Sequence, residues 1–338
     1  MEQPKYAKDQ PSGFTNRIDR VAIVGAGGRI GKHITEALIA KGKHEITVLS
    51  REGSGSKVAD GVKVVRVTYD DEESMISALR GQQFLIVSVA ATAPPGSQEK
   101  ILTAAAKAGV PWVMPNGYGI NAFNERLAKE AMIGPVAKSG IKAVEDGGVS
   151  SWILLVCGFW YEFSLAMGPP WYGFDFANKK VEFSDDGNTV INTSTWEQCG
   201  RAVAKLLSLK ELPDDENDDS PSISRWRNKP MFISSFQISQ RDMLDSVNRV
   251  KGLSDIDWKI EHEPSDVRYQ RGLDILKSGS RLGFVTALYA RGFYPNGDAN
   301  FEATETLAND ALGLPKESID EATKRAIQMV DEGFSTRN

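Results

Sequence analysis

Three glycines at intervals of three residues are the clearest sign of chemistry in this sequence. Gly25, Gly28 and Gly31 follow the apolar run 21–24 and precede a stretch with apolar residues at helical spacing. Such a strand–turn–helix unit lets backbone N–H groups approach a pyrophosphate, and the helix N-terminus favours negative charge. The pattern therefore predicts a dinucleotide-binding turn. The expected cofactor contacts in it are Gly25, Gly27, Gly28, Arg29, Ile30 and Gly31.

The residue after the second predicted strand, 45–50, selects between the two nicotinamide cofactors. An acid here usually holds the ribose hydroxyls of NAD, whereas a basic residue accommodates the 2′-phosphate of NADP. Arg51 occupies this position, Lys57 lies in the glycine- and serine-rich loop beyond it, and Glu52 comes one place late for the NAD role. The sequence predicts NADPH/NADP as the cofactor, bound in part by Arg51 and Lys57.

Further apolar runs alternate with helical segments along the first half of the chain. Strands are predicted at 62–67, 84–89, 112–115 and 152–157. This alternation is typical of an α/β fold of the Rossmann type, with a doubly wound parallel sheet. Because ligands bind beyond the carboxyl ends of such strands, the turns after the fourth and fifth strands also face the cofactor. Their expected contacts are Ala90, Ala91 and Asn116.

The composition divides the chain into three parts. Residues 1–18 are polar and without periodicity, and are predicted to be a flexible N-terminal arm. Residues 19–158 form the predicted NAD(P)-binding Rossmann domain. Residues 159–338 form a smaller α+β substrate-binding cap lobe, which could share elements with the first domain. Within this lobe, 180–183 and 189–192 flank a turn sequence and predict a hairpin.

Composition and motif searches exclude several classes of protein. The net charge of −5 over 338 residues, with no basic run, argues against nucleic-acid binding. There is no signal peptide and no apolar run near 18 residues, so we expect a cytoplasmic protein that does not bind membranes. The three histidines are scattered, so no metal site is expected, and Cys157 and Cys199 are interpreted as reduced core thiols. A monomer or a homodimer is expected.

Lysine is the best remaining candidate for acid–base chemistry. No tyrosine is followed four residues later by lysine, and the nucleophile elbow, the zinc-protease motif and the P-loop are all absent. Lys138 lies about one helix before the sixth predicted strand. A lysine facing an apolar nicotinamide pocket has a lowered pKa and can transfer a proton, although most lysines are solvated surface charges.

Aromatic residues gather after the predicted strand ends. They are either core between the two lobes or, as a group, the lining for a large, flat, apolar substrate. The substrate contacts predicted on the second interpretation are Tyr118, Phe159, Trp160, Tyr161 and Trp171, with Tyr172 beside them.

Several motifs together resemble the NmrA-like / isoflavone reductase-like family of atypical short-chain reductases. They are the glycine spacing, Ser50-Arg51, Gln98 with Ala105-Ala-Lys-Ala-Gly-Val110, Pro115-Asn-Gly-Tyr-Gly119, and Thr195 with Gly200-Arg-Ala-Val-Ala204. The resemblance covers residues 19–330. In the plant reductases of this family a lysine opens the helix before the sixth strand, and Lys138-Ser-Gly-Ile-Lys142 matches that pattern. The resemblance thus implies that Lys138 is catalytic or contacts the nicotinamide.

Two features set the chain apart from the plant members. Gly117 stands where the family's turn usually carries an acid, and the run 157–161 is similar to fungal members linked to secondary metabolism. The leading hypothesis is an NADPH-dependent reductase of a C=C, C=O or C=N bond in an aromatic or alkaloid-like small molecule. A second is an NADPH-dependent redox-coupled cyclase of the Diels–Alder type, whose pocket holds the substrate in a reactive pose. A third is a non-enzymatic, NmrA-like NADP-sensing regulator that binds a partner protein.

Overall fold

A parallel sheet of seven strands forms the centre of the part of the chain that the computed structural model describes, residues 5–55, 57–90 and 93–334. The order of its strands is β11-β6-β5-β4-β1-β2-β3, and every neighbouring pair is parallel. The strands are β1 (Arg20–Val24), β2 (Glu45–Arg51), β3 (Lys63–Val67), β4 (Phe84–Val87), β5 (Trp112–Met114), β6 (Ser151–Val156) and β11 (Lys229–Phe232). The predicted Rossmann-type fold is confirmed.

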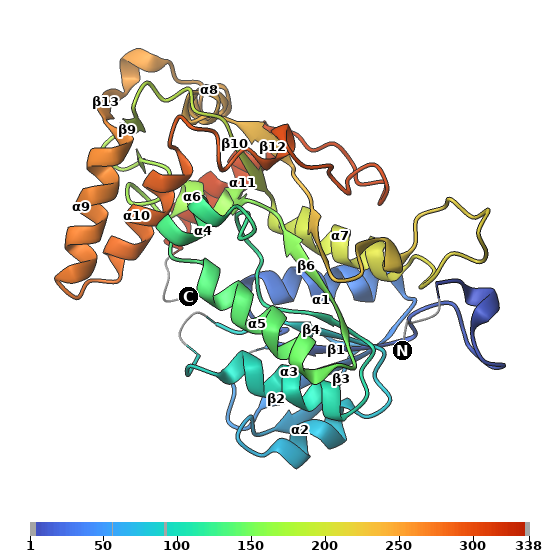
Figure 1. The fold of residues 1–338 in the computed structure, drawn as a ribbon. Helices are drawn as coiled ribbons and strands as arrows, with labels where there is room; N and C mark the ends of the chain where they lie inside the picture. Colours follow the sequence, from blue (N-terminus) through green and yellow to red (C-terminus); the bar gives the residue numbers. More distant parts are fainter. Residues whose placement is uncertain (1–4, 56, 91–92, 335–338) are drawn as a thin grey trace.

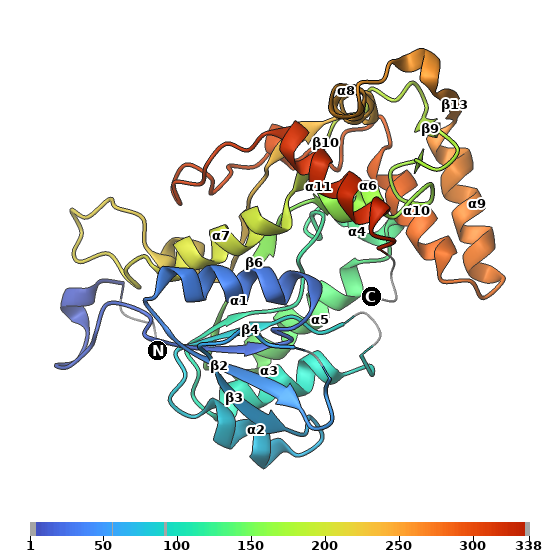
Figure 2. The same cartoon turned by 180° about the vertical axis from the view of Figure 1, so that it is seen from behind.

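Helices cover both faces of this sheet (Figures 1 and 2). α1 (Arg29–Lys41) and α7 (Trp196–Leu207) lie on one face, and α2 (Glu72–Leu79), α3 (Ser97–Lys107) and α5 (Gly134–Gly147) lie on the other. α1 and α7 pack closely because Gly200 has no side chain: a Cβ there would lie 2.4 Å from the backbone oxygen of His33. Strand β11 and helix α7 both come from the second half of the sequence, so that half completes the seven-stranded sheet and one of its helical layers.

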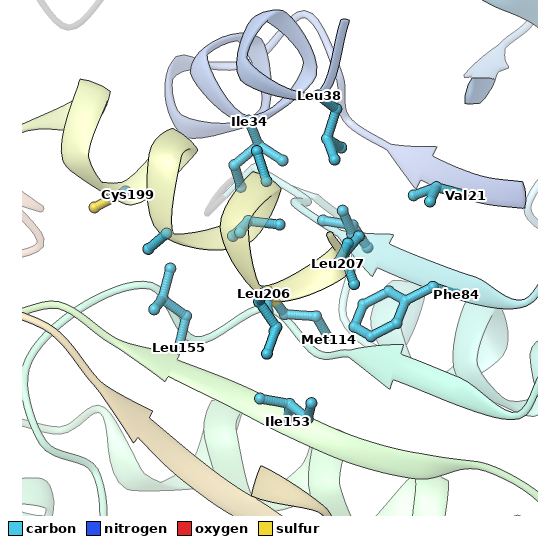
Figure 3. Packing of buried hydrophobic residues seen from close by; sticks show 14 of the residues in the cluster. Val21, Ile34, Leu38, Phe84, Met114, Ile153, Leu155, Cys199, Leu206 and Leu207 are labelled. Carbon is cyan, nitrogen blue, oxygen red and sulfur yellow. The ribbon is translucent and has the colours of Figure 1, made fainter. Parts of the chain in front are cut away.

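Apolar side chains fill the space between the sheet and the α1–α7 pair (Figure 3). Ile34 and Leu38 extend from α1, Leu206 from α7, and Phe84 and Ile153 from the strands, and all five are buried. Burying one such side chain contributes roughly 1.5–3 kcal/mol. This core holds the amino end of α1, and with it the glycine turn, rigidly against the sheet.

The cap lobe is built from two three-stranded sheets and several helices. One sheet has the order β12-β10-β7 and the other β13-β9-β8. Their strands are β7 (Phe159–Trp160), β8 (Phe174–Asp175), β9 (Lys180–Ser184), β10 (Ile191–Ser194), β12 (Phe236–Ile238) and β13 (Lys259–Glu263). The helices are α4 (Glu125–Glu130), α6 (Tyr161–Ala166), α8 (Gln240–Lys251), α9 (Ser265–Lys277), α10 (Leu282–Gly292) and α11 (Ile319–Asp331), with 3₁₀ turns at Asp255–Asp257 and Phe301–Ala303. A further 3₁₀ turn, Ile223–Trp226, packs in the core of the seven-stranded sheet.

The predicted hairpin in this lobe is wrong. β9 pairs with β8 and β13, whereas β10 pairs with β7 and β12. The chain does turn tightly at 185–187, where Asp185 and Gly187 both have positive φ. The Asp185 N–H, however, donates to Glu263 at the end of β13 and so holds β9 against that strand. The sequence signal for a turn is correct, but it does not determine which strands pair.

The N-terminal arm and the acidic loop 213–222 contact each other. The N–H of Ala7, in the 3₁₀ turn Ala7–Asp9, donates to the Pro213 oxygen at 2.8 Å. Lys210 forms ion pairs with Asp214 and Asp218 at the base of the loop. Residues 5–18 therefore lie along this loop. Among the helices of the described residues, none is both long and apolar enough to cross a membrane.

Candidate functional site

The glycine turn has the geometry that close approach of a phosphate requires. Gly25 has φ +82°, and a Cβ there would lie 1.8 Å from the Ser88 oxygen at the end of β4. A Cβ on Gly31 would lie 2.0 Å from the oxygen of Gly25, so α1 packs directly onto the turn. Gly28 is the N-cap of α1 and offers no side chain to accept a hydrogen bond from the helix's first turn. The N–H groups and the positive end at such a helix start suit a pyrophosphate.

Arg29 and Ile30 begin the helix and point in different directions. Ile30 is buried in the core below the turn. The Arg29 guanidinium turns toward the cap lobe, where it lies 5.1 Å from the ring of Phe163 and 5.8 Å from that of Phe334. Burial lowers the pKa of Arg29. Its side chain therefore links the glycine turn to the cap lobe.

Two arginines lie together at the carboxyl ends of β2 and β3. Arg51 is exposed at the end of β2, with its guanidinium 6.0 Å from the ring of Tyr69. Arg66 on β3 donates from Nη1 to the Ser50 Oγ at 2.9 Å and to the Arg51 oxygen at 3.3 Å. Lys57 is exposed in the loop that follows β2.

Sequence analysis missed Arg66. The register of the sheet pairs it with Ser50, next to Arg51. Neighbouring parallel strands end at the same edge of a sheet. The sequence could therefore have predicted that a basic residue near the end of the third strand lies close to the basic residue at the end of the second.

The ends of β4 and β5 meet beside the turn. The Asn116 side chain donates to the Val89 oxygen at 3.3 Å, and its backbone N–H donates to Gln98 Oε1 at 2.6 Å. Gln98 also donates to the Val136 oxygen of α5 at 3.3 Å, so one side chain ties β5, α3 and α5 together. Ala90 is exposed just beyond β4. The predicted contact at Ala91 lies outside the described residues.

Lys138 lies on α5 and is exposed. It shares a stripe of the helix with Lys142, which pairs with Asp146 at 2.7 Å. The buried face of the same helix is formed by Ala137, Gly140 and Val144. The structure thus places Lys138 at the solvent side of α5, and its catalytic role stays a prediction.

The glycine that departs from the family motif has a steric explanation. A Cβ at Gly117 would lie 2.5 Å from Cδ1 of Leu154, a fully buried residue of β6. A carboxylate side chain cannot fit there without displacing the core. Any side chain at position 117 would therefore have to displace Leu154.

The predicted aromatic contacts divide into two groups. Phe159, Tyr161 and Tyr172 are core residues: Phe159 stacks on Tyr289 at 4.2 Å, and the hydroxyls of Tyr161 and Tyr172 bond to Thr323 and Thr193. Tyr118, Trp160 and Trp171 lie in or beside a second cluster around Phe163 and Trp196. Sequence analysis did not single out Trp196, because the sequence there indicates only the first residue of a helix capped by Thr195.

A solvent-accessible hollow of about 940 Å³ lies elsewhere in the described residues, near Ser151 and Arg227. Ser151 begins β6, so this hollow is at the opposite edge of the sheet from the glycine turn. Cys157 and Cys199 are free, buried thiols, as expected from the sequence.

The sheet order and the glycine turn at the end of its first strand define a Rossmann-type dinucleotide-binding protein. Residues 17–131 match the model of the NmrA-like family. With the fold, this match confirms the resemblance to NmrA-like and isoflavone reductase-like proteins.

Similar proteins extend the resemblance beyond the matched residues. The chain is 25% identical over 315 residues to "Oxidoreductase aprR" of Aspergillus flavus, covering 89% of this chain and 96% of that protein. Its fold is shared by the pinoresinol-lariciresinol and phenylcoumaran benzylic ether reductases (TM-score 0.72, 19% identity, 91% and 99% of the two chains). It is also shared by AtPrR2 solved with NADP+ and (+)-pinoresinol (TM-score 0.69, 18% identity, 92% and 99%).

Proposed function

We propose that this protein is an NADPH-dependent reductase of an aromatic or alkaloid-like small molecule in secondary metabolism. The observation that carries the proposal is the pairing of the glycine turn at the start of α1 with two arginines at the ends of β2 and β3. The turn suits a pyrophosphate, and Arg51 with Arg66 suits a 2′-phosphate. A relative that is named an oxidoreductase and a neighbour that was solved with NADP+ support both parts.

The cofactor half of the proposal is tested by substituting Arg51. We expect the wild type to bind NADPH at least about tenfold more tightly than NADH, and Arg51→Ala to abolish this difference of about 1.4 kcal/mol. Binding is measured by energy transfer from tryptophan to the nicotinamide. Arg80→Ala is the control, because Arg80 is an exposed arginine that pairs with Glu73 away from the turn. Equal affinity of the wild type for the two cofactors would contradict the assignment to NADP.

The role of Lys138 is tested by Lys138→Met. If Lys138 transfers the proton that accompanies hydride transfer, kcat falls by about a hundredfold while NADPH affinity is nearly unchanged. Lys142→Met is the matched control, one turn further along the same exposed stripe. An unchanged kcat would remove Lys138 from the chemistry and leave it a surface charge.

The same turnover assay separates the alternative hypotheses. Oxidation of NADPH with an aromatic acceptor excludes a pure sensor. A product with a new ring, formed only while NADPH is consumed, identifies the redox-coupled cyclase. Selective binding of NADP+ without any turnover supports the regulator.

A further inference from the structure

Two strands of the cap lobe end side by side, next to a group of buried polar atoms that have no partner. β7 and β10 run parallel, and Trp160 is in register with Ser194. Within the described residues, no hydrogen-bond partner is present for Trp160 Nε1, Glu162 Oε2, Ser194 Oγ or Trp196 Nε1. The Tyr118 hydroxyl, which follows β5, is buried without a partner as well. Because buried polar atoms are nearly always hydrogen-bonded in native proteins, these atoms need a ligand or water as their partner.

The same side chains present aromatic surfaces. The rings of Trp160, Phe163 and Trp196 lie about 6 Å apart in each pairing, at 5.9, 6.0 and 6.0 Å. Trp160 and Phe163 are only half-buried, and the ring of Phe334 lies 6.3 Å from both Phe163 and Trp196 at the edge of the cluster. Rings at these separations prefer offset or edge contacts with a further aromatic ring.

This cluster adjoins the cofactor turn. The ring of Trp196 stacks on that of His33 of α1, with the ring centroids 5.5 Å apart. The Arg29 guanidinium lies 5.1 Å from the ring of Phe163. Both His33 and Arg29 lie in the first two turns of the helix that begins at the glycines. A molecule bound against Trp196 and Phe163 is therefore held close to the start of α1.

The unpartnered atoms define the chemistry of the ligand. An indole N–H only donates. Burial raises the pKa of Glu162, although the contact with Arg325 opposes this, and burial also raises the pKa of Tyr118. Oε1 of Glu162 accepts from Arg325 at 2.9 and 3.1 Å, which leaves Oε2 for another partner. The two indole N–H groups of Trp160 and Trp196 can only donate, so they need an acceptor atom from a ligand.

We propose that Tyr118, Trp160, Glu162, Ser194 and Trp196 form a substrate subsite for a flat aromatic molecule that carries a carbonyl oxygen. The aromatic ring lies against the Trp160–Phe163–Trp196 cluster, and the carbonyl oxygen accepts from the indole N–H groups. This inference rests on the reductase proposed above, and it adds a carbonyl group to the substrate and names the side chains that bind it.

The test compares two flat ligands that differ only in a carbonyl group, 1-indanone and indane. Their affinities for the NADP+ complex of the full chain are measured by calorimetry, so that no hydride is available. Trp196→Phe and Trp160→Phe each keep a ring and remove one N–H. We expect each variant to weaken 1-indanone binding about threefold to tenfold and to leave indane binding unchanged. Trp258→Phe is the control, because its N–H donates to Asn248 at 2.9 Å in another part of the cap.

The outcomes separate this inference from the proposed function. NADP+ is titrated first, and failure to bind it contradicts the reductase itself. If NADP+ binds but 1-indanone binds no better than indane, water satisfies the buried atoms and the subsite is wrong. Equal losses for both ligands in the tryptophan variants also overturn it, since packing alone would then explain the effect. The two tryptophan variants are independent, so one that fails to fold leaves the other as the test.

Discussion

Gly25→Ala is expected to abolish NADPH binding. The new methyl group lies 1.8 Å from the Ser88 oxygen, and the backbone of residue 25 has φ +82°. Either the turn moves or the end of β4 moves, and each change misaligns the N–H groups at the start of α1. Loss of two charge-assisted hydrogen bonds to the pyrophosphate weakens binding by at least about a hundredfold. Titration of NADPH into the folded variant measures this loss.

The same substitution also destabilises the fold. An alanine in the left-handed backbone conformation lowers the free energy of unfolding by about 1–2 kcal/mol, and overpacking lowers it by about 1–3 kcal/mol more. Gly42→Ala separates the two contributions, since Gly42 has φ +61° at the end of α1 but a Cβ there would meet nothing within 4 Å. We expect Gly42→Ala to lose only about 1–2 kcal/mol in urea unfolding and to bind NADPH normally. Normal NADPH binding by Gly25→Ala would contradict the placement of the pyrophosphate on this turn.

The cofactor half was predictable because its signals are local. Each strand from β1 to β6 is a short apolar run, and the turns between them carry glycine or a helix cap such as Asp71, which accepts from the Ser74 N–H. The run at 231–234 also has the pattern of a strand, but its place as β11 beside β6 could not be predicted. Two strands that are far apart in the sequence carry no local pattern that indicates their pairing.

The candidate site was predictable only where one residue carries the signal. The glycines and Arg51 met that condition. Arg66 and Trp196 did not, because their importance arises from the register of β3 with β2 and from the approach of α7 to α1. The aromatic run 159–161 illustrates the same limit. Alternate residues of a strand face opposite sides, so Phe159 enters the core while Trp160 turns toward the second cluster, and composition alone does not separate them.

Arg291→Met is expected to destabilise the protein by about 3–5 kcal/mol, because it breaks a buried ion-pair network. Arg291 is fully buried on α10, where it pairs with Glu130 and Asp298 and lies 4.8 Å from the ring of Tyr294. Asp298 also accepts from Arg126 at 2.7 and 2.9 Å, and from Asn124 at 3.2 Å. The network thus joins α10 to α4 and to the segment that follows β5 and carries Asn116 and Tyr118.

The stability that Arg291→Met is expected to lose depends on pH. Burial alone would raise the pKa of Asp298, but hydrogen bonds from Arg126, Arg291 and Asn124 outweigh it and hold the pKa well below its usual value. A depressed carboxyl pKa contributes stability above the unfolded value of about 3.9, and this stability is lost as the pH falls toward the folded value. Removing Arg291 raises the pKa of Asp298 in the folded state, so less of this stability remains to be lost in acid.

Urea unfolding at pH 7 and at pH 3 measures both effects. The difference in unfolding free energy between wild type and Arg291→Met should be largest at pH 7 and smaller at pH 3. Arg126→Met is the matched control: its side chain is 59% exposed, so removing the same charge from the same carboxylate should cost at most about 1 kcal/mol. If the two variants lose equal stability, burial does not set the strength of this network.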